Sequence, residues 1–244
     1  MKSILRKSIL YKSGISSLDY AMNPVLGCAH GCRYPCYAWL MAMRFGKVKS
    51  YTQWIQPAIV SNTLELLEKE LQKWHWKIRH VQLCLTTDPF MVGYPEVRQL
   101  SLESIRMINQ NGISCGILTK GVLPPELAEM DQRNSYGISL VSLDEEFRER
   151  WEPGAAPYRE RIDALRYLHN KGMHTWVHME PYPTPNVISQ DLNEILEEIS
   201  FVDSIDFGRW NYSSLISHFP DSDAFYRAME EQVRTFCEAH GIEY

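Results

Sequence analysis

Three of the six cysteines in this 244-residue sequence fall within nine residues of one another, in the string NPVLGCAHGCRYPCYA. On a helix, Cys28, Cys32 and Cys36 would share one face and could pack there as small hydrophobic side chains. Gly31 and Pro35 oppose a helix, because both residue types destabilise a helix interior. The segment therefore predicts a loop that gathers three thiols.

Three thiols in one loop are suited to binding a metal. A zinc site would use Cys28, Cys32, Cys36 and His30, but structural zinc usually draws on two short-spaced pairs of ligands, and no second pair follows here. Thiolates are also the normal ligands of iron–sulfur clusters, and three of them leave one iron of a cube open to a substrate or cofactor. We favour the cluster over zinc, and both over simple packing.

The composition limits what the protein can do. Hydrophobic residues make up 45% of the chain and charged residues 23%, as in folded globular proteins. The 25 basic and 30 acidic residues give a net charge of −5, whereas proteins that bind nucleic-acid backbones usually carry a basic surplus. We divide the chain into an N-terminal arm, 1–19, and a single domain, 20–244. The basic residues of the arm are expected to be solvated: Lys2, Arg6, Lys7 and Lys12.

The sequence also predicts a cellular compartment. It has no apolar run of roughly 18 residues that would span a membrane. Its charged start, MKSILRKSILYKS, lacks the continuous apolar core of a secretory signal. We therefore expect a cytoplasmic protein without a membrane partner, in which the cysteines stay reduced.

The elements that must position the cysteines follow from the alternation of apolar runs and amphipathic stretches. The strand candidates are 20–26, 81–85, 114–118, 136–141, 174–179 and 202–207. Helices are predicted around 64–74, 97–108, 162–168, 192–199 and 225–236. This alternation predicts an α/β fold with parallel strands, either a partial (β/α)6 barrel or a flat doubly wound sheet.

In either architecture, functional residues gather at the carboxyl ends of the strands. Several residues that could do chemistry follow the predicted strands directly: the 28–36 segment, Asp88, Lys120, Ser142, Glu180 and Arg209.

The cysteine segment resembles the cluster motif of the spore photoproduct lyase-like branch of the radical S-adenosylmethionine (SAM) superfamily. The matching residues are Asn23, Pro24, Gly27, Cys28, His30, Cys32, Tyr34, Cys36, Tyr37 and Ala38. Pro35 is one residue more than the usual Cys-x3-Cys-x2-Cys spacing, and we expect it to bulge outward without displacing a thiolate. Further segments resemble the branch in the same order along the chain: 87–90 (TDPF), 118–120 (LTK), 139–144 (SLVSLD) and 152–154 (EPG), followed by Arg161.

The resemblance implies a partial (β/α)6 barrel of the radical SAM type that holds a [4Fe–4S] cluster and SAM. In that superfamily the open iron binds the methionine part of SAM. One electron then cleaves SAM to methionine and a 5′-deoxyadenosyl radical, which abstracts hydrogen from the substrate. The resemblance also implies an electron donor such as ferredoxin or flavodoxin. It leaves the substrate open between a small molecule, a peptide and a nucleic acid.

The resemblance further implies roles for individual residues. The cluster ligands are Cys28, Cys32 and Cys36, and the candidates for binding SAM are Tyr34, Thr87, Asp88, Lys120, Ser139 and Ser142. Lys120 would pair with the SAM carboxylate, and Thr87 and Asp88 would hold its ammonium group. Strand alternation lets only one of the two serines face inward.

Two more cysteines lie within the predicted strands. Cys84 and Cys115 are expected to pack in the core. By analogy with the photoproduct lyase branch, Cys84 is nevertheless the candidate hydrogen-atom donor, with Tyr37 as the second catalytic candidate. His178 and Glu180, near the end of the fifth strand, are placed to touch a substrate.

Two alternatives to an unidentified radical SAM substrate stay open. One is a DNA-lesion (photoproduct) lyase, against which the net charge and the lack of a recognisable DNA-binding extension both count. The other is a non-enzymatic zinc or iron–sulfur binding module. Anaerobic purification separates the enzyme from a zinc module, because an iron–sulfur protein is brown and a zinc protein is colourless.

Overall fold

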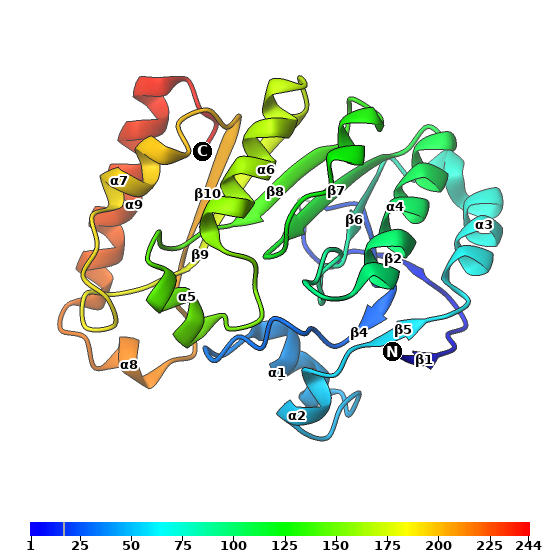
Figure 1. The fold of residues 1–244 in the computed structure, drawn as a ribbon, viewed down its shortest axis with the longest axis horizontal. Helices are drawn as coiled ribbons and strands as arrows, with labels where there is room; N and C mark the ends of the chain where they lie inside the picture. Colours follow the sequence, from blue (N-terminus) through cyan, green and yellow to red (C-terminus); the bar gives the residue numbers. More distant parts are fainter. Residues whose placement is uncertain (17) are drawn as a thin grey trace.

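The computed structural model describes residues 1–16 and 18–244. Its centre is a seven-stranded sheet with the order β10-β9-β8-β7-β6-β3-β2 (Figure 1). Six strands run parallel: β3 (Tyr20–Met22), β6 (His80–Leu83), β7 (Ser114–Thr119), β8 (Ser135–Ser139), β9 (His174–Tyr182) and β10 (Ser204–Arg209). The edge strand β2 (Leu10–Lys12) is antiparallel to β3. The sheet is curved but not closed, since β2 and β10 are its two edges.

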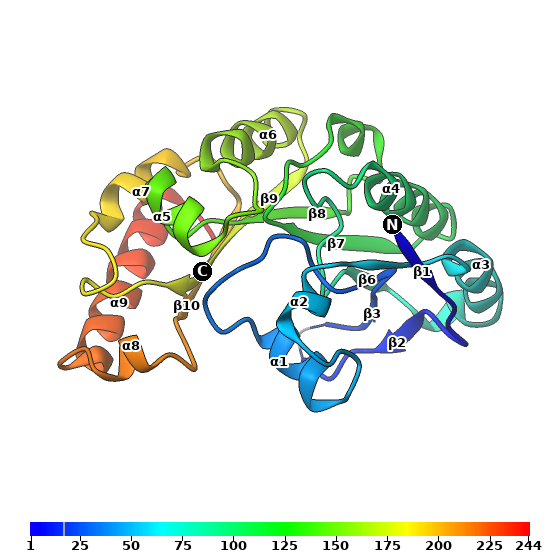
Figure 2. The same cartoon turned by 60° about the horizontal axis from the view of Figure 1, so that its bottom comes forward.

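Helices cover the outer face of this sheet, as the crossover connections of parallel strands require (Figure 2). They are α3 (Thr63–Trp74), α4 (Pro95–Gln110), α6 (Tyr158–Asn170), α7 (Leu192–Glu198) and α9 (Ser222–His240). Alternate strand residues such as Val177 and Met179 are fully buried beneath them. The five predicted helices and the predicted parallel α/β fold are thereby confirmed.

A second, three-stranded sheet supports the cysteine segment. It has the order β1-β5-β4, with β1 (Lys2–Ile4) parallel to β5 (Ala58–Val60) and β4 (Val25–Leu26) antiparallel to β5. Residues of the N-terminal arm thus join both sheets, through β1 and β2. Within the arm, Arg6 donates through Nη1 to the carbonyl oxygen of Asn23 at 2.9 Å.

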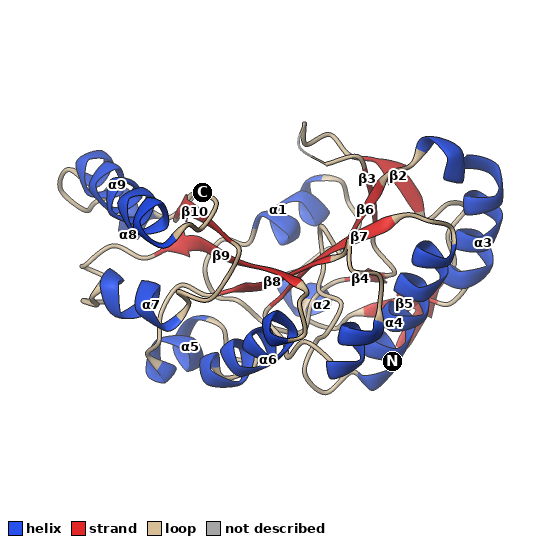
Figure 3. Cartoon of the chain, turned by 90° about the horizontal axis from the view of Figure 1, so that it is seen from above, coloured by secondary structure: helices blue, strands red, loops and turns tan. Residues whose placement is uncertain are grey.

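The concave side of the large sheet faces the chain segment that carries the cysteines. This segment leads into α1 (Tyr37–Arg44) and α2 (Tyr51–Trp54), which lie on the opposite side of the sheet from α4 and α6 (Figure 2). Figure 3 shows the strands crossing the molecule from β2 at one end to β10 at the other, with α1 beside them. The remaining elements are α5 (Glu145–Trp151), α8 (Ser214–Ser217) and the 3-10 turns η1 (His75–Lys77) and η2 (Pro125–Glu129).

Two local predictions need correction. The first strand candidate is broken at Asn23 and Pro24, so that β3 joins the large sheet and β4 the small one. Cys84 lies one residue beyond β6, in a backbone conformation with φ of 58°.

Within the described residues, none of the helices has the length and apolar character needed to cross a lipid bilayer. All six cysteines are free thiols.

Candidate functional site

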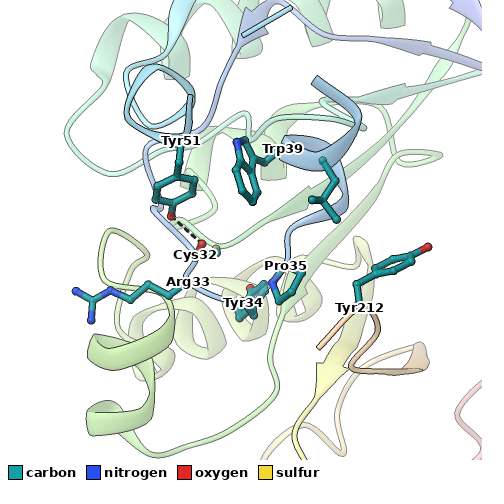
Figure 4. Close-up of a pocket in the computed structure, with 8 residues that line it drawn as sticks. Cys32, Arg33, Tyr34, Pro35, Trp39, Tyr51 and Tyr212 are labelled. Atoms are coloured by element: carbon teal, nitrogen blue, oxygen red, sulfur yellow. Dashed lines mark hydrogen bonds between the residues drawn. The ribbon is translucent and has the colours of Figure 1, made fainter. Parts of the chain in front are cut away.

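The cysteine loop connects β4 to α1 and is held by hydrogen bonds from distant segments. The amide of Cys28 donates to the carbonyl oxygen of Trp54 at 3.1 Å, and the hydroxyl of Tyr51 donates to the carbonyl oxygen of Cys32 at 2.7 Å (Figure 4). From the turn after α5, the amide of Gly154 donates to the carbonyl oxygen of His30 at 2.8 Å. These contacts fix the loop from both sides before any ligand binds.

Two glycines allow this close packing. Gly27 has φ of 94°, and a Cβ there would lie 2.4 Å from the carbonyl oxygen of Trp54. A Cβ on Gly154 would lie 2.3 Å from the carbonyl oxygen of Ala29. Both glycines belong to the motifs that the sequence analysis singled out, and both are required because backbone approaches backbone.

The three cysteines line one cavity of about 550 Å³ on the concave side of the sheet. The cavity also contains most of the residues predicted for the site: Tyr34, Tyr37, Cys84, Thr87, Asp88, Lys120 and Ser139. Ser142 is buried and does not line it, since its hydroxyl accepts a hydrogen bond from the amide of Asp144 at 3.1 Å. Cys115 packs on the helix side of the sheet, with its sulfur 3.9 Å from the side-chain nitrogen of Asn109.

A second, shallower cavity of about 470 Å³ opens on the other side of the cysteine loop (Figure 4). It shares Cys32, Tyr34, Pro35 and Tyr212 with the larger cavity. Pro35, the residue added to the usual spacing, therefore lies in the wall between the two cavities.

A buried ionic network lies beneath the loop. Glu152 is fully buried and accepts hydrogen bonds from Lys120 Nζ at 2.7 Å, from Arg161 Nη2 at 3.0 Å and from the hydroxyl of Tyr34 at 2.7 Å. Burial alone would raise the pKa of Glu152, but the charges of Lys120 and Arg161 lower it to about 2. Lys120, predicted to hold a carboxylate of SAM, thus already holds a carboxylate of the protein.

Asp88 connects the loop to the end of β7. One carboxylate oxygen lies 2.9 Å from His30 Nε2 and accepts from the amide of Lys120 at 2.8 Å, and the other accepts from the hydroxyl of Thr119 at 2.7 Å. Although burial opposes ionisation, these partners lower the pKa of Asp88. The neighbouring Thr87 donates its hydroxyl proton to the carbonyl oxygen of Gly27. Both side chains therefore position the loop.

Burial disfavours the ionised form of two of the loop thiols, Cys28 and Cys32. It raises the pKa of Cys28 well above its ordinary value, and nearby Asp88 and Cys32 raise it further. Burial also raises the pKa of Cys32 to about 12, against the lowering effect of the Lys120 ammonium. Thiolates at these positions are stable only when a positive ion compensates their charge.

The donor set fits an iron–sulfur cube. Within residues 1–16 and 18–244, no three His, Cys, Asp or Glu side chains stand close enough together to hold a single metal ion. The fit rests on the thiols themselves, since three cysteines of one pinned loop face one cavity, where each is available to a separate iron.

Both catalytic candidates line the cavity. Tyr37 begins α1 directly after Cys36, and its hydroxyl donates to the carbonyl oxygen of Leu85. Cys84, the residue before Leu85, is 5% exposed and lines the cavity. The hydrogen bond to Leu85 thus links Tyr37 to the segment of Cys84, 47 positions away in the sequence.

The far wall of the cavity, on β9 and β10, contains residues that the sequence analysis only partly identified. His178 and Glu180 were predicted there, and the cavity lining confirms their position. Trp176 also lines the cavity, as does Asp206. The period of two along β9 indicates that Trp176 shares the face of His178 and Glu180. The sequence around Asp206 does not predict a site residue. Asp206 lies opposite His178 only because of the register between β9 and β10.

Comparisons with known proteins agree with this site. A family model described as the radical SAM superfamily matches residues 22–199. An uncharacterised protein of Acidianus two-tailed virus is 27% identical over 188 residues, which are 74% of this chain and 61% of that protein. An uncharacterised protein of Methanocaldococcus jannaschii is 23% identical over 186 residues, which are 73% of this chain and 66% of that protein. The chain thus spans less than two thirds of the length of these relatives.

Solved structures share the fold. A spore photoproduct lyase complexed with dinucleoside spore photoproduct aligns with a TM-score of 0.67 and 15% identity, over 97% of this chain and 78% of that one. A variant of spore photoproduct lyase with bound SAM and the same dinucleoside aligns over the same shares, with a TM-score of 0.66 and 16% identity. At this level of sequence identity, the alignments show a shared fold.

Proposed function

Because the chain belongs to the radical SAM superfamily, we propose that it is an enzyme that cleaves SAM reductively and abstracts hydrogen from a substrate in the cavity described above. A [4Fe–4S] cluster on Cys28, Cys32 and Cys36 would supply the electron that converts SAM to methionine and a 5′-deoxyadenosyl radical. The observation that carries the proposal is the pinned loop, which presents three thiols to one cavity.

The protein's own contribution is to hold the cysteine loop rigid and to keep it away from bulk water. The Glu152 network and the Asp88–His30 contact lie behind the loop, and both are buried. Lys120 is near enough to Cys32 to lower the pKa of that thiol, so its positive charge favours the thiolate. Fixed charges that need no rearrangement during the reaction are an efficient form of electrostatic stabilisation.

Several cavity residues are proposed to bind SAM. Ser139, at the end of β8, lines the cavity next to β9, and Lys120 lines it at the end of β7. The ring of Tyr34 packs edge-to-face against Trp210 at 5.4 Å and forms part of the cavity wall. In this proposal Thr87 and Asp88 act on SAM mainly by positioning the loop, since their polar atoms already have partners.

Cys84 and Tyr37 are proposed as donors of a hydrogen atom to the radical that hydrogen abstraction would leave on the substrate. Both line the cavity, and Tyr37 is connected to the Cys84 segment through the carbonyl oxygen of Leu85. Burial raises the pKa of Cys84 well above its ordinary value, so the sulfur keeps its hydrogen at neutral pH. A reductant of the ferredoxin or flavodoxin type would supply the electrons.

The test is SAM cleavage under anaerobic conditions. Reconstituted protein with dithionite should release 5′-deoxyadenosine, measured by chromatography, even without a substrate. Cys32→Ala is the control, because it removes a ligand of the proposed cluster. The proposal fails if the iron-loaded protein makes no more 5′-deoxyadenosine than this control.

A further inference from the structure

The far wall of the cavity is formed by Trp176, His178 and Glu180 on β9 and by Asp206 on β10. These four residues, called the wall below, differ in charge from the rest of the cavity. His178 Nδ1 lies 2.6 Å from a carboxylate oxygen of Asp206, and His178 Nε2 lies 3.7 Å from a carboxylate oxygen of Glu180. One imidazole carries at most one positive charge between two carboxylates. The wall is therefore net negative whatever the protonation state of His178.

Among the described residues, the cavity lining contains a single Lys or Arg side chain, and it belongs to the ionic network beneath the cysteine loop. That side chain is Lys120. Its ammonium nitrogen lies 2.7 Å from a carboxylate oxygen of Glu152, so Lys120 is held in an ion pair on the side of the cysteine loop. Recognition of a phosphodiester depends on Lys and Arg contacts to phosphate oxygens, and the lining offers no other such side chain.

The cavity also contains polar side chains that use little of their hydrogen-bonding capacity. Gln82 is 8% exposed and lines the cavity, and among the described residues the only hydrogen bond of its amide is a long one, 3.5 Å from Nε2 to the carbonyl oxygen of Leu83. The indole nitrogen of Trp176 is buried without a hydrogen-bond partner in the same part of the chain. Buried polar groups normally have partners, so the amide of Gln82, which lines the cavity from β6, is available to a ligand.

Two glycines make room for these side chains. A Cβ on Gly208 would lie 2.4 Å from a carboxylate oxygen of Glu180, and a Cβ on Gly137 would lie 2.3 Å from the ring of Trp176. The carboxylates of Glu180 and Asp206 also stay accessible, with 41% and 65% of their side-chain surfaces exposed. The backbone is thus shaped to place an aromatic ring and an accessible carboxylate on one wall.

We propose that the substrate carries a primary ammonium or guanidinium group, seated between Trp176 and the carboxylates of Glu180 and Asp206. A cation gains from both the carboxylates and the face of a tryptophan ring. The inference rests on the proposed function, because it takes the molecule bound in this cavity to be the substrate of the enzyme. It excludes a phosphodiester as the group that this wall binds.

The test compares small probes that differ only in charge. Cluster-loaded, SAM-bound protein is titrated anaerobically by calorimetry with pentylamine, pentanol and pentyl phosphate. Pentylamine should bind about tenfold or more tightly than pentanol, the size expected for a hydrogen bond between charged groups, and pentyl phosphate should bind most weakly. A lysine tripeptide with blocked ends, titrated in parallel, tells whether the cation comes from a free amine or a peptide side chain.

Matched variants assign the preference to the wall. The double variant Glu180→Gln/Asp206→Asn should lose the preference for pentylamine over pentanol. The double variant Glu197→Gln/Glu238→Gln, which changes two exposed carboxylates on α7 and α9, should keep it.

Three results would overturn the inference: equal binding of pentylamine and pentanol, tighter binding of pentyl phosphate, or a larger loss of SAM affinity than of amine affinity in the Glu180→Gln/Asp206→Asn variant. The last result would assign the carboxylates to SAM. Loss of the amine preference alone, with 5′-deoxyadenosine still formed, would leave the proposed function intact. Retained amine binding without 5′-deoxyadenosine would overturn the proposed function and leave the cation site standing.

Discussion

The cysteine loop and the β9–β10 wall face the same cavity but are built in opposite ways. The loop is fixed by hydrogen bonds from Trp54, Tyr51 and Gly154, and the charges behind it are paired and buried. On the wall, Glu180 and Asp206 are accessible, and among the described residues the indole nitrogen of Trp176 has no hydrogen-bond partner. A rigid end suits a cofactor that must be held in one geometry, and an accessible end suits a ligand that enters and leaves.

The largest expected effect is on cluster binding by the cysteine loop. Changing Cys28, Cys32 or Cys36 singly to Ala should abolish the cluster, because each thiolate would hold its own iron. Iron analysis after anaerobic reconstitution should find about four irons per chain in the parent protein, the stoichiometry of a thiolate-bound cube.

Cys237→Ala is the control, since Cys237 is buried in α9 and does not line the cavity. Full iron retention in any of the three loop variants would remove that cysteine from the ligand set.

The next effect is on stability. Glu152→Gln should lower the free energy of unfolding at pH 7 by about 3–5 kcal/mol, the usual result of removing one partner from a buried ion pair. Lys120 and Arg161 would lose the carboxylate that balances them. Urea unfolding followed by tryptophan fluorescence measures the loss, with Glu197→Gln as the exposed control. A loss below about 1 kcal/mol would show that the network does not stabilise the loop.

The same network predicts a pH dependence. The pKa of Glu152 is lowered in the folded protein from 4.5 to about 2, so its stabilisation is complete above pH 4.5 and is lost as the pH falls from 4.5 towards 2. At 1.36 kcal/mol per pKa unit, the loss is roughly 3 kcal/mol. Unfolding at several pH values should show that Glu152→Gln lacks this component. Parallel pH profiles for the parent and the variant would contradict the assignment.

A smaller effect, on SAM affinity, is expected at Lys120. Lys120→Ala should weaken SAM binding by roughly 1.5–3 kcal/mol, the range for a hydrogen bond to a charged group. Anaerobic calorimetry of cluster-loaded protein measures it, with Lys171→Ala as an exposed control. Unchanged affinity would leave Lys120 as a partner of Glu152 alone.

The smallest effect is expected at Pro35. Deleting this residue restores the usual spacing, and the cluster should be retained, because hydrogen bonds at Cys28 and Cys32 hold the loop on the side before the proline. The rate of 5′-deoxyadenosine formation should change by up to the order of 10²-fold, the cost of displacing a reacting group by about an ångström. Loss of iron in the deletion variant would show that Pro35 is needed to place Cys36.

The strands and the long helices could be predicted because their signals are local. Apolar residues at helical spacing predicted α4 from Val97 to Ile108, and both residues are fully buried. The short strands β1, β2 and β5 were missed, since three residues give too little periodicity to detect and their pairing partners lie far along the chain.

The sequence by itself determined the donor chemistry of this protein. Three cysteines in a segment broken by Gly31 and Pro35 predict a metal-binding loop, because ligand type and helix propensity are properties of neighbouring residues. Tertiary structure alone decided which polar groups are free. Lys120 meets Glu152 32 positions away, and His30 meets Gly154 124 positions away. Such pairs arise from the order of the strands and the packing of the loops, which patterns among neighbouring residues do not predict.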